Sequence, residues 1–228
     1  MRRRTVLTAG GATAAAAGLG GCYLFQDGLY LWVSGGDSGS GLSKSAAVRE
    51  WVPLRYEVDP ARSRLGFRAT RFRIDEVPGE FRRYTGVGIM NSETDPALNF
   101  VTGTVEADSV DTGNRWRDSH LCSDEYLAAK RFPQMHFRST CVTPLGLGEN
   151  GHKRFCVAGD MEMRGIHRQV ELAVEVVPSD SPNEVEFHAT GEVQRFDFEI
   201  GRRTPSLAMG STVRLDFHLR ATSRPLNA

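Results

Sequence analysis

The side chains best suited to chemistry are Asp118 and His120, which stand two positions apart. A carboxylate and an imidazole at this spacing can work as a general acid and a general base. No partnering nucleophile is evident beside them, which favours a polar cluster that fixes local structure. An enzyme that uses Asp118 and His120 in catalysis stays open as an alternative function.

Other motifs with known chemistry find little support in the sequence. Residues 146–151 (GLGENG) match the dinucleotide pattern G-x-G-x-x-G, but a strand pattern follows them where a helix should open, so we interpret them as a hairpin loop. The sequence contains no H-E-x-x-H, C-x-x-C or G-x-S-x-G motif, and its six histidines occur singly. We therefore predict no metal site and no catalytic cofactor.

Cys141 and Cys156 lie symmetrically on either side of this loop. In a regular hairpin they would be directly opposite each other, a geometry that approaches disulfide distances. Such a bond would persist in an exported protein. The sequence is consistent with a disulfide between Cys141 and Cys156 and also with two separate thiols that the register brings near. In either case Cys122 is the odd thiol.

The elements that must position these residues are β-strands, because apolar and polar residues alternate with a period of two. This alternation is typical of antiparallel strands with one face on a core and the other in water. Turn signals such as Asp59–Pro60 and Asn150–Gly151 separate the stretches. About eight strands at this spacing predict an all-β, mainly antiparallel sandwich or barrel.

One segment breaks the alternation and predicts a short helix over residues 123–130, within the crossover 115–131. Ser123 is its expected N-cap, acidic residues fill its first turn and Lys130 lies in its last turn.

The inward positions of the strands mix large and small residues. The interior of an eight-stranded barrel is either filled by side chains or holds one small ligand. Small residues such as Gly103, Gly159 and Gly191 leave room, and Met161 and Met163 provide a polarisable lining. From the residues alone, a filled core and an open cavity are both consistent.

The composition excludes several classes of protein. The chain has 228 residues, with 28 basic and 28 acidic side chains, so bulk positive charge for nucleic-acid binding is lacking. Hydrophobic residues at 40% and charged residues at 25% are ordinary for a globular protein. No run of 18 strongly apolar residues is available for a conventional spanning helix.

Residues 1–22 are predicted to be an export signal that ends in a lipid anchor. Residues 3–7 (RRTVL) follow the twin-arginine pattern, and residues 5–21 are uncharged and weakly apolar. Residues 19–22 (LGGC) resemble a lipobox, in which the Cys22 thiol receives a lipid that anchors the protein stably. An ordinary signal peptide with a chance cysteine is the alternative.

Two further regions follow the signal. Residues 23–50 are expected to be a tether, since residues 34–45 are rich in glycine and serine. Residues 51–224 are expected to form the barrel domain. Removing residues 1–21 takes away three arginines and no acid, so 25 basic and 28 acidic residues remain, a net charge of −3.

Ordered motifs run through the whole domain. They are residues 56–67 (YEVDPARSRLGF), 77–81 (VPGEF), 109–121 (SVDTGNRWRDSHL), 132–140 (FPQMHFRST), 159–165 (GDMEMRG) and 195–201 (RFDFEIG). In this series the domain resembles the YceI-like polyisoprenoid-binding family. Glu199 stands where the family pattern has glycine, which puts the local turn in doubt.

The resemblance implies a lipocalin-like, eight-stranded antiparallel barrel of an exported bacterial protein, with an isoprenoid chain in an apolar pore and no established catalytic residues. The residues expected to bind the lipid are Leu65, Phe67, Phe81, Val105, Phe137, Met161, Met163, Phe187, Phe217, Arg117 and His120. Arg117 and His120, with Asp118, are expected at the mouth. There they either contact the lipid head group or hold the crossover in place.

The predicted function is therefore that of a non-enzymatic, lipid-anchored protein on the outer side of the cell membrane. It holds or carries an isoprenoid quinone or a polyprenyl carrier. The expected partners are this lipid and the membrane, with a homodimer as a further expectation. Two alternatives remain. One is an enzyme that acts on isoprenoid lipids, with Asp118 and His120 as acid and base, and the other is a filled barrel that serves as an envelope scaffold with no ligand.

Overall fold

The computed structural model describes residues 53–72, 74–91, 98–179, 181, 183–206 and 208–226. The predicted signal, anchor and tether therefore lie outside the described residues. Most of the described chain forms strands, which are β1 (Leu54–Val58), β2 (Arg64–Arg71), β3 (Asp75–Phe81), β4 (Tyr84–Met90), β5 (Phe100–Glu106), β6 (Val110–Asp111), β7 (Gln134–Leu147), β8 (Lys153–Met163), β9 (Ile166–Pro178), β10 (Glu184–Gln194) and β11 (Met209–Pro225).

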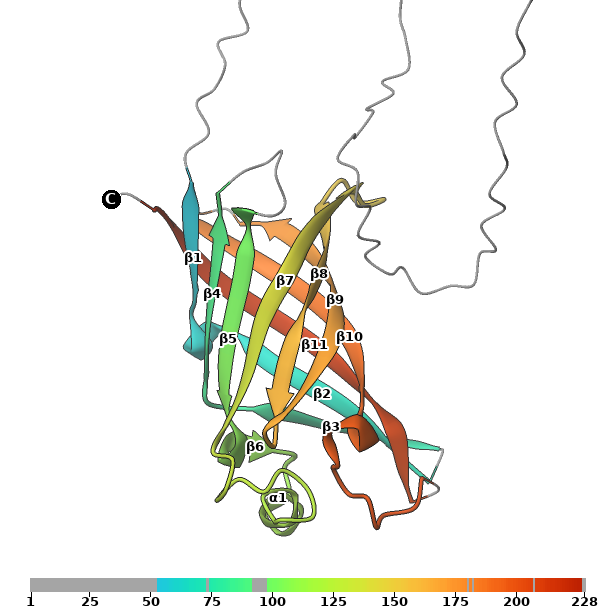
Figure 1. The fold of residues 1–228 in the computed structure, drawn as a ribbon. Coiled ribbons are helices and arrows are strands. Elements are labelled where there is room, and N and C mark those ends of the chain that lie inside the picture. The colour runs from blue at the N-terminus through green and yellow to red at the C-terminus, as the bar shows by residue number, and fades with distance from the viewer. Residues whose placement is uncertain are drawn as a thin grey trace, which may run out of the picture.

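These strands form a closed, eight-stranded antiparallel barrel (Figure 1). The long strand β11 closes it, because the C-terminal part of β11 pairs with β1 and its N-terminal part pairs with β2. Strands β4 and β3 continue in the same way beside β1 and β2. The short strands β1 and β2 thus follow one another at one position in the barrel wall, and β4 and β3 do so at the next position. The predicted fold class is confirmed.

The register explains why the alternating residues face inward together. Phe187 of β10 lies opposite Val176 of β9 and Leu219 of β11, so one row of apolar side chains crosses three strands. The neighbouring residues along each strand then point outward. The buried core cluster lies on several strands and the loops beside them, with Met135, Val157, Leu172, Val193 and Phe198 among its members.

Several small inward residues accommodate large neighbours, contrary to the expectation that they leave open space. A Cβ atom added at Gly159 would lie 2.5 Å from Cζ of Phe137, and one at Gly191 would lie 2.7 Å from Cδ2 of Leu172. Gly103 differs, since its nearest atom would be the backbone oxygen of Thr85 at 3.5 Å. The glycines therefore let larger side chains lie flat against the barrel wall.

The crossover between β6 and β7 contains a helix, but not over the predicted residues. Helix α1 spans Arg115–Leu121, and the side chain of Asn114 caps it by accepting hydrogen bonds from the backbone N–H groups of Trp116 and Arg117. The prediction of a helix over 123–130 is wrong, because this segment consists of turns in which Ala128 is buried at φ +51°. Burial of Ala128 and Ala129 overrides their helix propensity. No helix in the described part of the chain is long and apolar enough to cross a membrane.

The predicted register of Cys141 and Cys156 is also wrong. A bulge between Ser139 and Cys141 shifts the β7–β8 pairing, so Cys141 lies opposite Ala158 and Cys156 lies opposite Thr143. Residues that are diagonal in this way have Cα atoms about 7–8 Å apart, beyond the usual range of a disulfide. Within the described residues, Cys141 forms no disulfide bond.

Candidate functional site

The barrel encloses an apolar cavity of about 530 Å³. Inward side chains from all of the long strands line it, from Tyr56 and Phe100 near one end of the barrel to Trp116 and Thr204 near the other. This volume is within the range of about 300–1,000 Å³ that small-molecule sites occupy. The open interior counts against a barrel filled by its own side chains.

The structure places every predicted lipid-contacting residue in the wall of this cavity. The apolar members come from strands far apart in the sequence and are Leu65, Phe67, Phe81, Val105, Phe137, Met161, Met163, Phe187 and Phe217. The two polar members, Arg117 and His120, line the cavity from α1. One enclosed surface thus gathers residues that the alternation assigned to a common face.

Aromatic rings make up much of the wall and contact each other across the strands. The ring centroids of Phe67 and Phe81 are 5.5 Å apart, and those of Tyr56 and Phe187 are 5.6 Å apart in an edge-to-face arrangement. Burial raises the pKa of the Tyr56 hydroxyl, which stays neutral. These rings offer a large apolar surface with hardly any charge.

Arg117 and Asp118 hold helix α1 in place at one end of the cavity. Arg117 donates from Nε to Thr112 Oγ1 at 2.7 Å and from Nη2 to the Thr112 backbone oxygen at 2.8 Å. Asp118 Oδ1 accepts from the N–H and the hydroxyl of Thr112 at 2.9 and 2.6 Å. Both charged residues therefore bind the turn that precedes the helix.

His120 has different neighbours from Asp118. Its ring centroid lies 5.6 Å from that of Trp116 and 4.8 Å from that of Tyr126. Because Asp118 binds Thr112 and His120 packs among aromatic rings, the arrangement does not assemble an acid–base pair. It suits a helical cover over the end of an apolar cavity.

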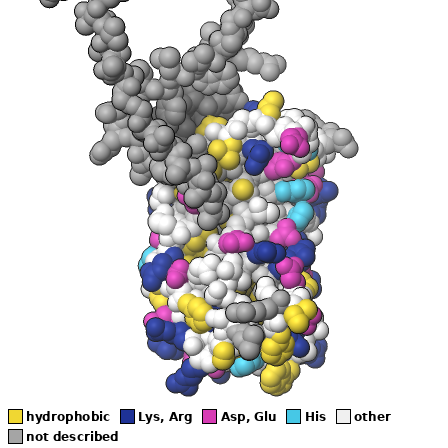
Figure 2. Space-filling model, turned by 90° about the vertical axis from the view of Figure 1, so that its right-hand side faces the viewer, with side chains coloured by type: hydrophobic (Ala, Val, Ile, Leu, Met, Phe, Trp, Pro, Cys, Tyr) yellow, Lys and Arg dark blue, Asp and Glu magenta, His cyan; other side chains and the backbone are white. Residues whose placement is uncertain are grey.

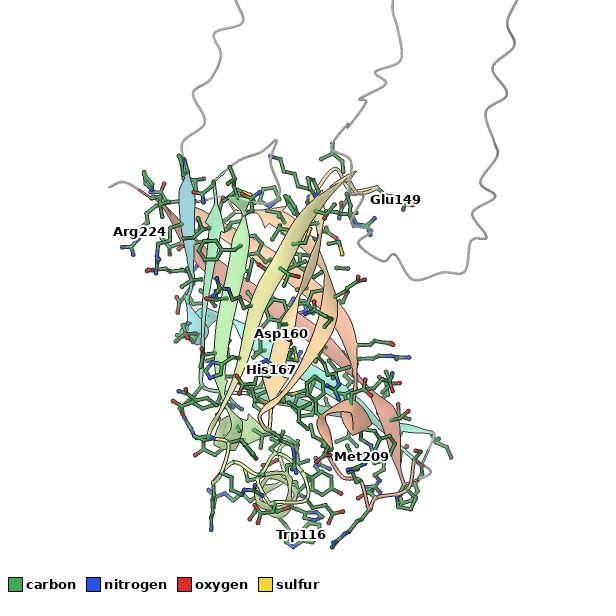
Figure 3. All side chains as sticks on the ribbon, in the orientation of Figure 1. Trp116, Glu149, Asp160, His167, Met209 and Arg224 are labelled. Atoms are coloured by element: carbon green, nitrogen blue, oxygen red, sulfur yellow. The ribbon has the colours of Figure 1, made fainter. Side chains whose placement is uncertain are left out.

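Trp116 is the most prominent exposed side chain of this cover. Its side chain is 78% exposed, and Figure 3 places it at the lower tip of the molecule. Phe72 and Ile74, beside the turn between β2 and β3, are also exposed. The end of the barrel next to α1 therefore presents apolar side chains to the surroundings.

Arg195, the first residue of the motif 195–201, has a structural role that the sequence did not reveal. Its side chain is only 1% exposed, yet all of its N–H groups are bonded to backbone oxygens, at distances of 2.5 to 3.0 Å. The acceptors are the carbonyls of Ile200, Gly201, Thr204, Met209 and Gly210. Burial lowers the pKa of this guanidinium. Arg195 thus fixes the loop between the 3₁₀ turn Arg195–Phe198 and β11 at the edge of the cavity.

Glu199, the departure from the family pattern, lies in the same loop. It adopts the left-handed conformation with φ 58° and ψ 22°, which glycine favours. Its carboxylate accepts a hydrogen bond from Arg202 at 2.9 Å. The turn keeps a conformation suited to glycine although a side chain is present.

The outer wall of the barrel has the opposite character from the cavity. Figure 2 shows basic, acidic and histidine side chains distributed over one outer face. Ion pairs such as Arg62–Glu184 at 2.6 Å and Arg224–Glu57 at 2.7 Å join neighbouring segments there. The hydrogen bond from Arg62 lowers the pKa of the Glu184 carboxyl. The pKa of the Glu57 carboxyl is lowered mainly by a hydrogen bond from Arg55 and further by Arg224.

The closed antiparallel barrel around an apolar cavity has the architecture of the lipocalin-like barrels. The sequence model described as "YceI-like domain" matches residues 56–221, and the chain belongs to the YceI-like family. The resemblance seen in the motifs is thereby confirmed.

Individual relatives agree with this assignment. Protein YceI of Salmonella newport is 28% identical over 155 residues, which cover 65% of this chain and 78% of that protein. BcnA of Burkholderia cenocepacia has a similar structure, with a TM-score of 0.64 and 22% identity over 72% of this chain and 99% of that one. A polyisoprenoid binding domain from Saccharophagus degradans matches with a TM-score of 0.57 and 15% identity, over 74% of this chain and 98% of that one.

Proposed function

We propose that this protein binds a long isoprenoid lipid, a quinone or a polyprenyl carrier, inside the barrel and carries or stores it outside the cytoplasm. The observation that carries the proposal is the apolar cavity of about 530 Å³, which runs past rings and aliphatic chains from every long strand. The similar domain from Saccharophagus degradans is named for polyisoprenoid binding, which supports the same class of ligand.

The driving force is burial of apolar surface. An isoprenoid tail in water exposes apolar area, and burial returns about 25 cal/mol for each Å² before the cost of ordering the chain. Because the wall has few polar groups, the tail gains affinity along its whole length with little selectivity. Selectivity then comes from the ends of the cavity.

The end beside α1 is the proposed mouth. Arg117 and His120 line the cavity there, and Arg195 brings a buried positive charge to the edge of the same space. A polar or anionic head group would find donors at this end. The contacts of Arg117 with Thr112 favour a supporting role for this residue, so His120 is the better candidate for direct contact.

The proposed location follows from the sequence of residues 1–50, which lie outside the described residues. The twin-arginine pattern, the lipobox at Cys22 and the Gly/Ser-rich stretch support export followed by anchoring through a lipid. A tethered barrel would stay close to the membrane that contains its ligand. Metabolic labelling with a fatty acid, compared between the wild type and Cys22→Ala, tests the anchor separately from lipid binding.

The test of ligand binding is extraction of lipid from the full-length protein purified from its native membrane. We expect about one isoprenoid lipid for each chain, and recovery of the same stoichiometry after delipidation and reconstitution. Protein that yields only bulk phospholipid, and that takes up no isoprenoid on reconstitution, would overturn the proposal.

A further inference from the structure

The outward faces of β10 and β11 bring together two histidines that are thirty positions apart in the sequence. His188 lies directly opposite His218 in the antiparallel register. Their ring centroids are 4.4 Å apart, with an interplanar angle of 57°. Both side chains face away from the cavity, because their neighbours Phe187 and Phe217 line it.

A carboxylate from the same face completes the group. Glu186 precedes His188 by two positions on β10, and its Oε1 lies 2.9 Å from Nε2 of His188. One ligand atom each from Glu186, His188 and His218 can be chosen so that all three lie within 4.8 Å of one another. Glu186 and His188 are half-buried, while His218 is exposed.

We infer that Glu186, His188 and His218 form a site on the outer wall that binds a divalent transition-metal ion of the Zn²⁺ class. Two imidazoles and one carboxylate are a ligand set that Zn²⁺ uses, with a fourth position left for water. Imidazole ligands also suit Cu²⁺ and Ni²⁺ but not Mg²⁺ or Ca²⁺. The site is separate from the apolar cavity and does not depend on the proposed lipid.

The geometry requires only side-chain movement. Ligand atoms at 2.0–2.2 Å from a tetrahedral Zn²⁺ lie roughly 3.3–3.5 Å from each other. The three atoms must therefore close by up to about 1.5 Å from their present spread of up to 4.8 Å. Opposite residues of antiparallel strands hold their Cβ atoms at about 4.5–5.5 Å, a spacing from which two imidazoles can turn toward one ion.

Two further carboxylates lie next to the imidazoles. On β9, Glu175 lies opposite His188, and on β11, Asp216 Oδ1 is 3.2 Å from Nε2 of His218. Such carboxylates orient ligating imidazoles and raise their basicity. Arg220 lies 3.6 Å from Glu186, Arg68 lies 3.4 Å from Asp216, and His152 lies 2.6 Å from Glu175. Arg64 of β2 lies opposite His218 and pairs with Glu80 at 3.1 Å. Each of the three carboxylates thus has a basic neighbour, so the ligand geometry, and not the net charge, favours the ion.

Zn²⁺ binds an ionised carboxylate and neutral imidazoles. The hydrogen bond from His188 lowers the pKa of the Glu186 carboxyl, so this group is ionised.

The experiment titrates the full-length chain, without an affinity tag, with Zn²⁺ at pH 7.5 in competition with a chelating indicator. We expect one ion for each chain. His188→Gln and His218→Gln should each weaken binding at least about tenfold, a loss that changes in the surroundings of a metal site can already produce. Melting in metal-free buffer checks that both variants are folded.

His167→Gln is the matched control. His167 also faces outward and hydrogen-bonds a carboxylate, with Nδ1 2.6 Å from Asp160 Oδ2, but it has no second imidazole opposite, since Glu162 is its register partner. This variant should bind Zn²⁺ as tightly as the wild type. Equal affinity in the wild type and His218→Gln, or an equal loss in His167→Gln, would overturn the assignment.

Co²⁺ gives a second readout that a merely structural role would not produce. A tetrahedral Co²⁺ complex absorbs in the visible, and the band should appear in the wild type and be absent from both ligand variants. Zn²⁺ should also raise the melting temperature of the wild type, because it binds only the folded state. A wild-type protein with no visible Co²⁺ band and no Zn²⁺ shift at pH 7.5 would contradict the proposal.

Discussion

The inner and outer faces of the barrel wall are built from the same strands and have opposite chemistry. On β10, Phe187 and Ala189 line the cavity while Glu186 and His188 lie on the outside. The stability of the inner face depends on close packing and apolar area, so one added methylene or one buried charge changes it measurably. The outer face depends on ion pairs in water, each of which contributes about 0–1 kcal/mol. The same substitution should therefore have very different effects on the two faces.

The largest contrast should come from placing a guanidinium on each face. Phe137→Arg or Met161→Arg puts a charge inside the apolar cavity, where no carboxylate lines the wall among the described residues. We expect uptake of an isoprenoid lipid to be lost in both variants. Reconstitution with a labelled lipid measures this, after melting curves have shown that the variants fold.

Gln169→Arg is the control for this comparison, since Gln169 is exposed on β9. Its lipid uptake should equal that of the wild type. Unchanged uptake in folded Phe137→Arg would mean that the lipid does not occupy the cavity.

The next contrast compares a buried arginine with an exposed one. Arg195→Met leaves five backbone oxygens without their donor, and each buried unsatisfied group costs about 1–3 kcal/mol. We expect the free energy of unfolding to fall by about 3 kcal/mol or more. Arg202→Met, which removes only an exposed pair with Glu199, should change it by less than about 0.5 kcal/mol. Denaturant titration measures the free energy of unfolding of both variants. Similar losses in the two would contradict a structural role that is special to Arg195.

Helix α1 provides a smaller, local effect. Asp118→Ala removes the acceptor for the N–H and hydroxyl of Thr112, at a cost of about 1–3 kcal/mol. Asp124→Ala, at an exposed position in the following turns, is the control and should be near neutral. Limited proteolysis should cut the 112–131 crossover faster in Asp118→Ala. Equal cleavage rates would show that Asp118 does not hold the helix.

The smallest effect is the response of the outer face to acid. Hydrogen bonds from Arg62 and His188 lower the pKa values of Glu184 and Glu186 below the ordinary 4.5. Carboxyls whose pKa is lowered on folding stabilise the protein above the unfolded value, and this contribution is lost as the pH falls through the folded value. The melting temperature should thus fall below about pH 4.5, and Glu184→Gln should reduce the slope slightly. A melting temperature that rises on acidification would contradict this sign.

Much of the inner face could be predicted from the sequence, because alternation with a period of two assigns residues to one face without knowledge of strand pairing. Leu65, Phe137 and Phe217 reached the same cavity for this reason. What could not be predicted is where neighbouring strands pair. The bulge next to Cys141 moved it away from Cys156, and the register that joined His188 to His218 left no local signal.

Local propensity failed where burial decided the conformation. The segment 123–130 has an acidic start, a basic end and two alanines, yet Ala128 is buried in a left-handed turn and the helix lies one segment earlier. The cap that matters is Asn114, which directly precedes Arg115. Arg195 illustrates the same limit, because its place in the motif 195–201 does not show that backbone oxygens will surround its side chain.

The central claim is that the inner face holds an isoprenoid lipid, and native mass spectrometry of the full-length protein from its native membrane tests it most directly. The account predicts a complex of one chain with one lipid, in masses that differ by isoprene units, and loss of this complex in Met161→Arg. A chain that carries no lipid, or a lipid that Met161→Arg retains, would contradict it.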